Sequence, residues 1–598
     1  MGAIVGALLR SERPEPSRVL RMLAVSPHRG TNVSHRVFGT AVLGISNRPD
    51  LVEATISVEG DLCGVFVGSL DNLRELLTTL SHAGTPAASE TPADVLVAAF
   101  RAFGLEAPTR MRGDFAAIVT DGRRLWVFRD HLGYRPLFFR DGPRGFFAGT
   151  EAKQVVAGAE LTREPDLEVL EQIMYGRMPD EMPSALKGVS RLPKATILTV
   201  GPEKAAGPVR YWQPERIVET ANISPSDLPA RFAELFEQAV ARRLKGNDVV
   251  SLSGGIDSPA VAGFAAPLHR ELTGKPLGAL SAVFPDLPRV DERPYIETVT
   301  EYLGMTLHTC RLKARAWDDL ESWCNLFDGP IPTTNTPQIV EFYQEARRLG
   351  FRNVLTGDIA ECVFDLQHHV TGHLLLRGRW RPLARLLSTQ RRQGKSWKSL
   401  AAQLVNPLVP GSIALWYLSV RGLDFPKRIP LWLEKQKVNQ RPYRNDLLVP
   451  AHLRWSALQT LPLRGCPITL EAVDMCTSLT GVTVGRPFGD VDFWEFFLSL
   501  PAEMKYPDLK SKTLLRTLLR GKVPDKILDR RDKTFFDDHA MSQIDYPLLR
   551  RYLVAPKYQM PGVDYRALAS RIEREEFDLI DLMWVNDLVR IHAFLNQW

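Results

Sequence analysis

The segment Ser253–Ser258, Ser-Gly-Gly-Ile-Asp-Ser, constrains the fold of this chain more than any other part of the sequence. It follows a short apolar run, Asp248–Leu252, and precedes a stretch with helical spacing, Pro259–Leu272. Glycines between a strand and a helix let the backbone approach a phosphate, and the helix N-terminus supplies N–H donors and partial positive charge. No Gly-Lys-Ser/Thr follows, so this is not a Walker loop. The segment predicts a phosphate-binding loop, and a purely structural glycine-rich turn is the alternative.

Strands and helices are expected to alternate after this loop. Apolar runs at Leu277–Phe284, Thr306–Leu312 and Asn353–Leu355 predict strands, and helical spacing predicts helices at Arg293–Leu303 and Gln338–Leu349. Strands that alternate with helices form a parallel sheet covered by helices on both faces. The rest of the chain toward the C-terminus has mostly helical spacing.

The N-terminal third of the chain has a different pattern. Short apolar runs at Ala116–Thr120 and Leu125–Phe128 are separated by Asp-Gly-Arg-Arg, which is typical of a β-hairpin. Helical spacing predicts one helix at Pro92–Phe103. The stretch Gly201–Leu228 is rich in Pro, Gly and Ser and suits a linker between domains. A β-rich N-terminal domain is therefore expected.

Length and composition agree with a globular protein of more than one domain. The chain has 598 residues, of which 44% are hydrophobic and 24% charged. We predict one domain over residues 1–215 and a second over 225–598. The net charge of +6 is too small for this length to argue for nucleic acid. No uninterrupted apolar stretch is long enough to span a membrane, and the six scattered cysteines are expected to be reduced thiols, so a cytoplasmic protein is expected.

Several segments resemble known families. Ser253–Ser258 resembles the SGGxDS pyrophosphate loop of the N-type ATP pyrophosphatases, which split ATP between its α and β phosphates. Arg112–Ala116 and Arg129–Leu137 resemble the GDFA and RDxxGxxPL segments of class B asparagine synthetases. Thr356–Glu361 resembles that family's SGEGxDE segment, and Lys512–Lys533 resembles its closing K-x-x-LR…R-x-K segment. Each segment alone is a weak signal, but their order and spacing together are specific.

The resemblance implies an α/β protein in two parts. The first is an N-terminal Ntn-hydrolase-like β-rich sandwich domain, which is a degenerate glutamine amidotransferase type 2-like domain. The second is a C-terminal N-type ATP pyrophosphatase domain, with a parallel, HUP-like sheet and helical additions, that forms amide bonds with ATP.

The N-terminal domain lacks the nucleophile of its glutamine-using relatives. Those relatives carry a cysteine directly after the initiator methionine, and this chain carries Gly2. A thiolate is needed to attack the side-chain amide of glutamine. The family's substrate-binding Asn-Gly-Glu is Val67–Ser69 here, and its acidic group for the glutamine amine is replaced near Thr91–Ala93. We predict that this domain is a scaffold without glutaminase activity.

Amide formation from a carboxylate sets which groups the second domain needs. Adenylation makes AMP the leaving group, and metal and cationic groups neutralise the departing pyrophosphate. By resemblance, Asp257 and Glu361 are predicted Mg²⁺ ligands, and Lys533 is predicted to neutralise the adenylate and pyrophosphate. Asp358 is predicted to contact the amine or act as its base, and helix capping or loop solvation is the alternative for Asp358 and Glu361. The predicted nucleotide contacts are Leu252, Ser253, Gly254, Gly255, Asp257, Ser258, Val283 and Gly357.

A basic segment, Thr371–Lys398, contains no acidic residue. Two tryptophans, Trp380 and Trp397, lie within it. One interpretation is a solvated helix face. The other is a docking surface for an acidic or extended substrate peptide or a partner protein. The basic residues are Arg377, Arg379, Arg381, Arg385, Arg391, Arg392, Lys395 and Lys398.

Three functions remain open from the sequence. Relatives that have lost the nucleophile include lasso peptide cyclases, β-lactam synthetases and carbapenam synthetases. The first hypothesis is macrolactam closure of a lasso precursor peptide, with a leader peptidase or leader-binding protein as a partner. The second is a small-molecule lactam synthetase, or an asparagine synthetase-like enzyme that uses external ammonia. The third is a catalytically silent binding subunit. ATP and Mg²⁺ are the expected cofactors of the first two, and neither a nucleic acid nor a membrane is expected as a partner.

Overall fold

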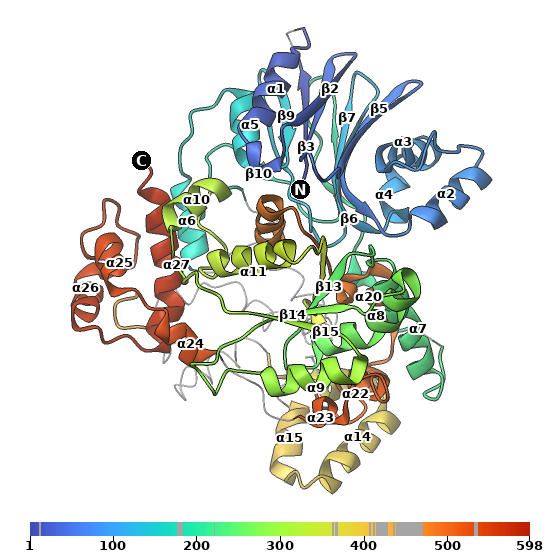
Figure 1. Cartoon of the computed structure of the whole chain (residues 1–598), viewed down its shortest axis with the longest axis vertical. Coiled ribbons are helices and arrows are strands. Elements are labelled where there is room, and N and C mark those ends of the chain that lie inside the picture. The colour runs from blue at the N-terminus through green and yellow to red at the C-terminus, as the bar shows by residue number, and fades with distance from the viewer. Residues whose placement is uncertain are drawn as a thin grey trace.

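The computed structural model shows two domains in contact (Figure 1). It describes residues 1–10, 13–175, 183–220, 222–360, 364, 369–405, 408–410, 413, 429–434, 437, 470–530 and 536–598. The N-terminal strands lie at the top of the view, and the parallel sheet with its helices lies below them. Within these ranges, the helices are too short or too polar to cross a bilayer.

The N-terminal domain is a sandwich of two antiparallel sheets. The first has the order β10-β8-β9-β1-β3-β2 and the second the order β12-β11-β7-β6-β5-β4. Apolar side chains of both sheets, such as Ile4, Val65 and Ile118, meet in the space between them. The first sheet contains β1 (Ala3–Leu9), β2 (Asn32–Phe38), β3 (Ala41–Asn47), β8 (Phe138–Gly142), β9 (Gly145–Gly149) and β10 (Ser190–Arg191). The second contains β4 (Ala54–Glu59), β5 (Leu62–Leu70), β6 (Gly113–Thr120), β7 (Leu125–Arg129), β11 (Thr196–Val200) and β12 (Val209–Arg210).

Helices cover the outer faces of both sheets. On the first sheet, α1 (Pro16–Ala24) and α5 (Ala152–Ala159) pack against the side of β1 that carries Ala3, Val5 and Ala7. On the second sheet, α2 (Leu73–His82) and α3 (Pro92–Phe103) cover β4 and β5. This four-layer arrangement confirms the predicted Ntn-type sandwich, and α3 has the predicted bounds.

The predicted linker is only partly a linker. Val209–Arg210 forms strand β12 and pairs with β11, because this stretch extends the edge of the second sheet. Just beyond it, the Tyr211 hydroxyl donates to the backbone carbonyl of Arg129 at 2.6 Å. The Trp212 indole N–H donates to Glu495 of the C-terminal domain at 2.9 Å. The stretch therefore fastens one domain to the other.

The C-terminal domain is built on a parallel five-stranded sheet, as predicted. Its order is β15-β14-β13-β16-β17, and each neighbouring pair is parallel. The chain places β14 and β15 on one side of β13 and then returns to place β16 on the other side. Such a switch point opens a crevice at the carboxyl ends of the two strands, where ligands bind. The strands are β13 (Asp248–Ser251), β14 (Gly278–Ala282), β15 (Thr306–Cys310), β16 (Asn353–Leu355) and β17 (Thr483–Gly485), with helices α7 (Leu228–Ala241), α8 (Asp257–Thr273), α9 (Arg293–Leu303) and α11 (Thr336–Arg348).

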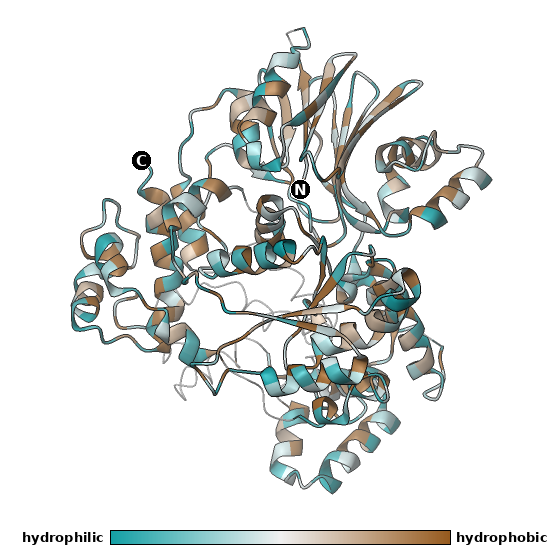
Figure 2. Ribbon diagram, viewed as in Figure 1, coloured by the Kyte–Doolittle hydropathy of each residue, from teal (hydrophilic) through white to brown (hydrophobic). Residues whose placement is uncertain are grey.

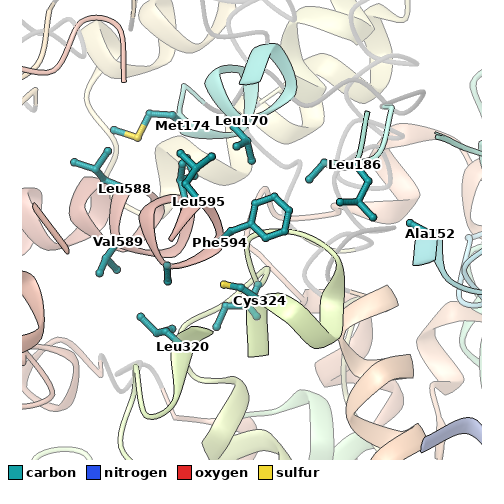
Figure 3. Close-up of a cluster of buried hydrophobic side chains, with 14 of the residues drawn as sticks. Ala152, Leu170, Met174, Leu186, Leu320, Cys324, Leu588, Val589, Phe594 and Leu595 are labelled. Atoms are coloured by element: carbon teal, nitrogen blue, oxygen red, sulfur yellow. The ribbon is translucent and has the colours of Figure 1, made fainter. Parts of the chain in front are cut away.

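The remainder of the chain is mostly helical, as expected. The last helix, α27 (Leu579–Leu595), packs against α6 (Leu167–Met174) of the N-terminal domain and against α10 (Leu320–Phe327). Figure 3 shows Leu588 and Leu595 of α27 beside Met174 and Leu170 of α6, with Cys324 of α10 nearby. The other helices are α13 (Val370–Leu376), α14 (Trp380–Arg392), α15 (Trp397–Val405), α20 (Val491–Ser499), α21 (Ala502–Lys505), α22 (Thr513–Leu518), α23 (Asp525–Leu528), α24 (Asp537–Ser542), α25 (Tyr546–Leu549) and α26 (Tyr565–Arg574). One apolar core thus spans both domains.

Buried ion pairs also join the domains. Residues 470–480 form a helix that lies between the two domains, and its Asp474 forms ion pairs with Arg29 and Arg135, each at 2.8 Å. Arg135 also reaches Glu53 at 3.4 Å. These side chains are almost fully buried. Burial alone would raise the pKa of Asp474, but the two arginines hold that pKa below its usual value.

A second group of ion pairs joins the domains beside α20. Arg243 pairs with Asp71 of the N-terminal domain at 2.9 Å and with Asp490 at 3.0 Å. Arg112 of the N-terminal domain pairs with Asp492 at 2.8 Å. Each carboxylate meets a guanidinium inside the interface, so neither domain can separate without leaving buried charges unpaired.

We expect Asp474→Ala to destabilise the protein strongly. The change leaves Arg29 and Arg135 without their shared carboxylate, and breaking a buried ion pair in this way costs about 3–5 kcal/mol. Thermal and denaturant unfolding of the purified variant measures the loss. Glu234→Ala is the matched control, because the Glu234–Arg231 pair at 2.7 Å is exposed and should contribute less than about 1 kcal/mol. Equal shifts for the two variants would contradict a stabilising role of the interface pair.

Candidate functional site

The glycine-rich loop follows β13 and leads into α8, as predicted. The Ser253 amide donates to the Ser258 hydroxyl at 2.9 Å, and the two hydroxyls lie 2.9 Å apart. The Gly254 amide donates to Glu292 at 2.8 Å. These contacts fix the loop in place at the start of α8, where helix N–H groups and the helix dipole favour an anion.

Two glycines allow the loops of the site to touch. A Cβ added to Gly357, just after β16, would lie 2.6 Å from the Ser258 nitrogen and 2.8 Å from the Asp257 carbonyl carbon. A Cβ on Gly254 would lie 2.8 Å from the Glu292 Cβ. No side chain fits at these distances, so the close approach requires glycine. The loops after β13 and β16 therefore meet at the switch point of the sheet.

Two ion pairs lie beside the glycine-rich loop. The Lys512 ammonium donates to both carboxylate oxygens of Asp257, at 2.7 and 2.9 Å. Arg530 pairs with Glu292 at 2.9 Å and also donates to the Gly254 carbonyl. Lys512 belongs to a family segment that the sequence displays, whereas the sequence predicted no site role for Arg530 or Glu292. The members of each ion pair lie far apart in the sequence, so no local pattern indicates that they meet. The only available signal was that acidic residues follow successive predicted strands.

Asp358 faces the same crevice. The Thr356 hydroxyl donates to its carboxylate at 2.9 Å, and the Arg486 guanidinium lies 3.8 Å away. The Asp358 side chain is 53% exposed, so it can reach a ligand. The next residue, Ile359, has a φ of 76°, a backbone conformation that strongly favours glycine. A β-branched residue held in this conformation stores local strain beside the site.

A cavity of about 710 Å³ opens at this edge of the sheet. Leu252, Ser253 and Asp358, three of the predicted site residues, line it. Its volume lies within the range of small-molecule binding pockets. The lining also includes uncharged polar and aromatic side chains, namely Thr333, Asn335, Gln338, Phe342 and Tyr343.

The predicted backbone contacts to a nucleotide are partly occupied by the sheet. The Leu252 amide donates to the Leu280 carbonyl at 2.9 Å, and the Val283 amide donates to the Cys310 carbonyl at 3.0 Å. The Ser253 amide is held by the neighbouring hydroxyl described above. Nucleotide contacts from these three positions would therefore come from carbonyl groups or side chains.

Two predicted catalytic residues, Glu361 and Lys533, lie outside the described residues. Their predicted roles remain predictions. Asp257 is described, and its side chain is 26% exposed at the loop. In the part of the chain that the structure describes, no three His, Cys, Asp or Glu side chains cluster closely enough to hold a metal ion.

The described surroundings of Gly2 in the N-terminal domain are tightly packed. A Cβ on Gly2 would lie 2.7 Å from the Ser46 carbonyl oxygen and 2.9 Å from the Asn47 side-chain oxygen. The cavity beside Met1 measures about 10 Å³, which is about the space of a single water molecule. Leu470 borders this small cavity and also lines the large one in the C-terminal domain. The interdomain helix at residues 470–480 therefore forms a wall between them.

Gly357→Ala should disrupt the site and leave the fold intact. The new methyl group would collide with the backbone of the first turn of α8, which must then shift away. We expect nucleotide affinity to fall by about tenfold or more, measured by calorimetric titration with ATP. Gly207→Ala is the control, because nothing lies within 4 Å of its Cβ position. Unchanged affinity in Gly357→Ala would show that the contact between the loops is dispensable.

Gly2→Cys should not restore glutamine hydrolysis. The cysteine would be forced against Ser46 and Asn47, and the remaining cavity cannot hold the substrate. We expect no release of glutamate from glutamine by the wild-type protein or by this variant, in an assay with and without ATP. Steady glutamate release by either protein would contradict the assignment of this domain as a scaffold.

The comparisons with known proteins agree with this architecture. The Asparagine synthase family model matches residues 231–576, and the Glutamine amidotransferase domain model matches residues 1–212. The chain is 26% identical over 500 residues to asparagine synthetase 3 (glutamine-hydrolysing) of Bacillus subtilis strain 168, covering 79% of this chain and 75% of that protein. It is 27% identical over 242 residues to carboxyethyl-arginine beta-lactam-synthase of Streptomyces clavuligerus, covering 40% and 44%.

Among solved structures, glutamine phosphoribosylpyrophosphate amidotransferase from B. subtilis matches with a TM-score of 0.28 at 12% identity, over 59% of this chain and 74% of that chain. The family model for asparagine synthase covers more than half of the present chain, including the glycine-rich loop and the parallel sheet. The chain therefore belongs to the asparagine synthase family, whose members are ATP-dependent, AMP-forming amide ligases.

Proposed function

We propose that this chain closes an amide bond within a peptide substrate. It would adenylate an Asp or Glu side chain of the peptide and join that side chain to the peptide's own N-terminal amine, as lasso peptide cyclases do. The observation that carries the proposal is the contrast between the two cavities. The cavity at the N-terminal site measures about 10 Å³, whereas the one beside the glycine-rich loop measures about 710 Å³.

The closed N-terminal site favours an amine that arrives with the substrate. Ammonia made from glutamine would have to come from a site that has neither a nucleophile at Gly2 nor space for glutamine. The amine must therefore enter through the mouth of the large cavity, by the same route as the carboxylate. An amine and a carboxylate on one molecule react with a large advantage in effective concentration.

The wall of the cavity favours a side chain within a peptide over a free amino acid. The charged residues that line the described part of the cavity are Glu292 and Asp358, and no lysine or arginine is among them. A free aspartate would bring an α-carboxylate, which requires a cationic partner when it is desolvated. The α-carboxylate of a residue within a peptide is already an amide. Asn335, Gln338 and similar uncharged side chains can hydrogen-bond to such a backbone.

The first chemical step is attack of the carboxylate oxygen on the α-phosphorus of ATP, with pyrophosphate as the leaving group. In this step Lys512 and Arg530 are placed beside the glycine-rich loop to neutralise phosphate charge. Asp257 fits as one ligand of Mg²⁺, because its carboxylate already attracts a cation at this position. Bound Mg²⁺ would supply further positive charge at the phosphates.

The second step is attack of the amine on the acyl-adenylate, with AMP as the leaving group. An N-terminal ammonium must first lose a proton, and Asp358 is the exposed carboxylate in the cavity that can accept it. The Thr356 hydroxyl holds this carboxylate in position at 2.9 Å.

A small-molecule lactam synthetase is the second candidate. The observation that favours it is the match to the carboxyethyl-arginine beta-lactam-synthase, over 40% of this chain. Mass spectrometry distinguishes the two, because each product is smaller than its substrate by one water and only one class of substrate reacts. A catalytically silent subunit would form no AMP with either class.

Turnover should yield AMP and pyrophosphate and should depend on Lys512. We expect Lys512→Ala to lower turnover by about 10²–10³-fold, because it removes a positive charge from the position where pyrophosphate charge develops. Lys510→Ala is the control, because Lys510 is 63% exposed and pairs only with nearby Asp508 among the described residues. AMP and pyrophosphate are quantified by chromatography. Formation of ADP and phosphate, or normal turnover by Lys512→Ala, would contradict the proposed chemistry.

A further inference from the structure

The three helices α13, α14 and α15 form a basic insertion on the outside of the C-terminal domain. Figure 1 shows α14 and α15 at the lower edge of the molecule, beside α22 and α23. Apolar residues of the insertion, such as Leu374 and Leu383, pack against Tyr506 and Leu509. The Gln390 amide also donates to the Asp508 carbonyl at 2.6 Å. The insertion is therefore a packed part of the domain with a defined outer face.

One row of arginines runs along this outer face. Arg381, Arg385 and Arg392 fall within about 40° of one another around α14, at 100° per residue. Leu383 and Leu386, which are buried, lie on the opposite side of the helix. All three arginines are exposed, and Figure 2 shows hydrophilic residues on α14. The row therefore faces solvent.

The arginine row has no acidic partner in the described structure. Arg381, Arg385 and Arg392 form no ion pair with any described residue, and neighbouring like charges one turn apart repel each other. Arg379 differs, because it faces the domain and pairs with Glu219 at 3.3 Å and with Glu503. Arg379, which faces the domain, is thus neutralised by carboxylates of the protein. The arginine row remains available to an anion from outside.

Two exposed tryptophans flank the row. Trp380 is 64% exposed and Trp397 is 69% exposed, although large aromatic side chains are usually mostly buried. The Arg391 guanidinium lies 5.4 Å above the Trp397 ring. Tryptophan and arginine are the residues that contribute most to protein–peptide contacts. The combination is typical of a docking surface and is unnecessary for solubility.

The insertion is linked to the catalytic loops at both of its attachments. It follows the Asp358 loop in the chain, and it packs against residues 502–509, which lead directly to Lys512. A molecule bound on the arginine row would therefore lie on an element that packs against the segment before Lys512. This placement suits a substrate better than an unrelated partner.

We propose that the arginine row and its two tryptophans bind an acidic segment of the peptide substrate, outside the cavity where the amide forms. The proposal rests on the proposed peptide substrate. Opposite charge would speed the encounter and hold the peptide while its reactive end enters the cavity. Attachment at a second point raises the effective concentration of that end.

Binding of a fluorescein-labelled glutamate-rich peptide, measured by fluorescence anisotropy, tests the proposal. We expect Arg381→Glu/Arg385→Glu/Arg392→Glu to weaken binding by about tenfold or more, because three attractive contacts become repulsive. The affinity of the wild-type protein should fall as salt is added, and that dependence should shrink in the variant. The same peptide with glutamine at every glutamate should bind weakly to both.

A matched variant controls for total charge. Arg74, Arg123 and Arg124 are exposed, lie on the N-terminal domain and form no ion pair with any described residue. Their triple change to glutamate should leave peptide binding unchanged. The proposal would be overturned if both triple variants weakened peptide binding equally. It would also be overturned if the arginine-row variant bound the peptide with wild-type affinity.

Two further measurements distinguish peptide docking from membrane binding and from damage to the ATP site. The first is binding of the wild-type protein to vesicles rich in anionic lipid. If the vesicles bind more tightly than the peptide, and the arginine-row variant loses this vesicle binding, the row is a membrane-binding surface and the proposal is overturned. ATP binding by the variant tests the site independently. Weakened peptide binding with unchanged ATP binding supports docking on the insertion, even if the substrate in the cavity proves to be of another class.

Discussion

The shared carboxylate of Asp474 is the interaction on which the rest of the structure depends. Arg29 and Arg135 reach it from the N-terminal domain, and its helix lies between the two cavities. A buried charge must be paired, so this contact fixes how the domains sit on each other. The apolar core around α27 then fills the space beside it. These contacts hold the N-terminal domain firmly against the C-terminal domain.

The packing around Gly2 contrasts with the open crevice of the C-terminal domain. Gly2 packs closely against Ser46 and Asn47. Arg135 pairs with Glu53 and Asp474 in the interface. The N-terminal domain thus contributes burial and ion pairs, and its deletion would expose the core that it shares with α27.

The crevice of the C-terminal domain depends on a different constraint, which is the close approach of two loops. The sheet order brings the ends of β13 and β16 together, and glycine at position 357 lets the loop after β16 touch the backbone of Asp257 and Ser258. At this crevice Asp257 pairs with Lys512, and Glu292 pairs with Arg530. The two cations favour a ligand of high negative charge over a ligand with a single carboxylate. The strained Ile359 shows that this loop keeps a glycine-like conformation with a larger side chain.

The sequence by itself determined the class of fold and the location of the nucleotide loop. The Ser253–Ser258 segment lies between an apolar strand and a helix, and the predicted bounds of the helix at Arg293–Leu303 and the strand at Asn353–Leu355 are those of the structure. Such elements depend on local spacing, which a sequence displays directly. The loss of the nucleophile at Gly2 was also visible as a single residue.

Only the tertiary structure decided which side chains meet. Lys512 reaches Asp257 across 255 positions of sequence, and no local pattern indicates that contact. The β12 strand within the predicted linker formed because the edge of β11 was available for pairing. The closed site at Gly2 likewise depends on neighbours from β3 and β4. Local propensity sets the elements, whereas long-range packing and charge pairing decide which of them share a site.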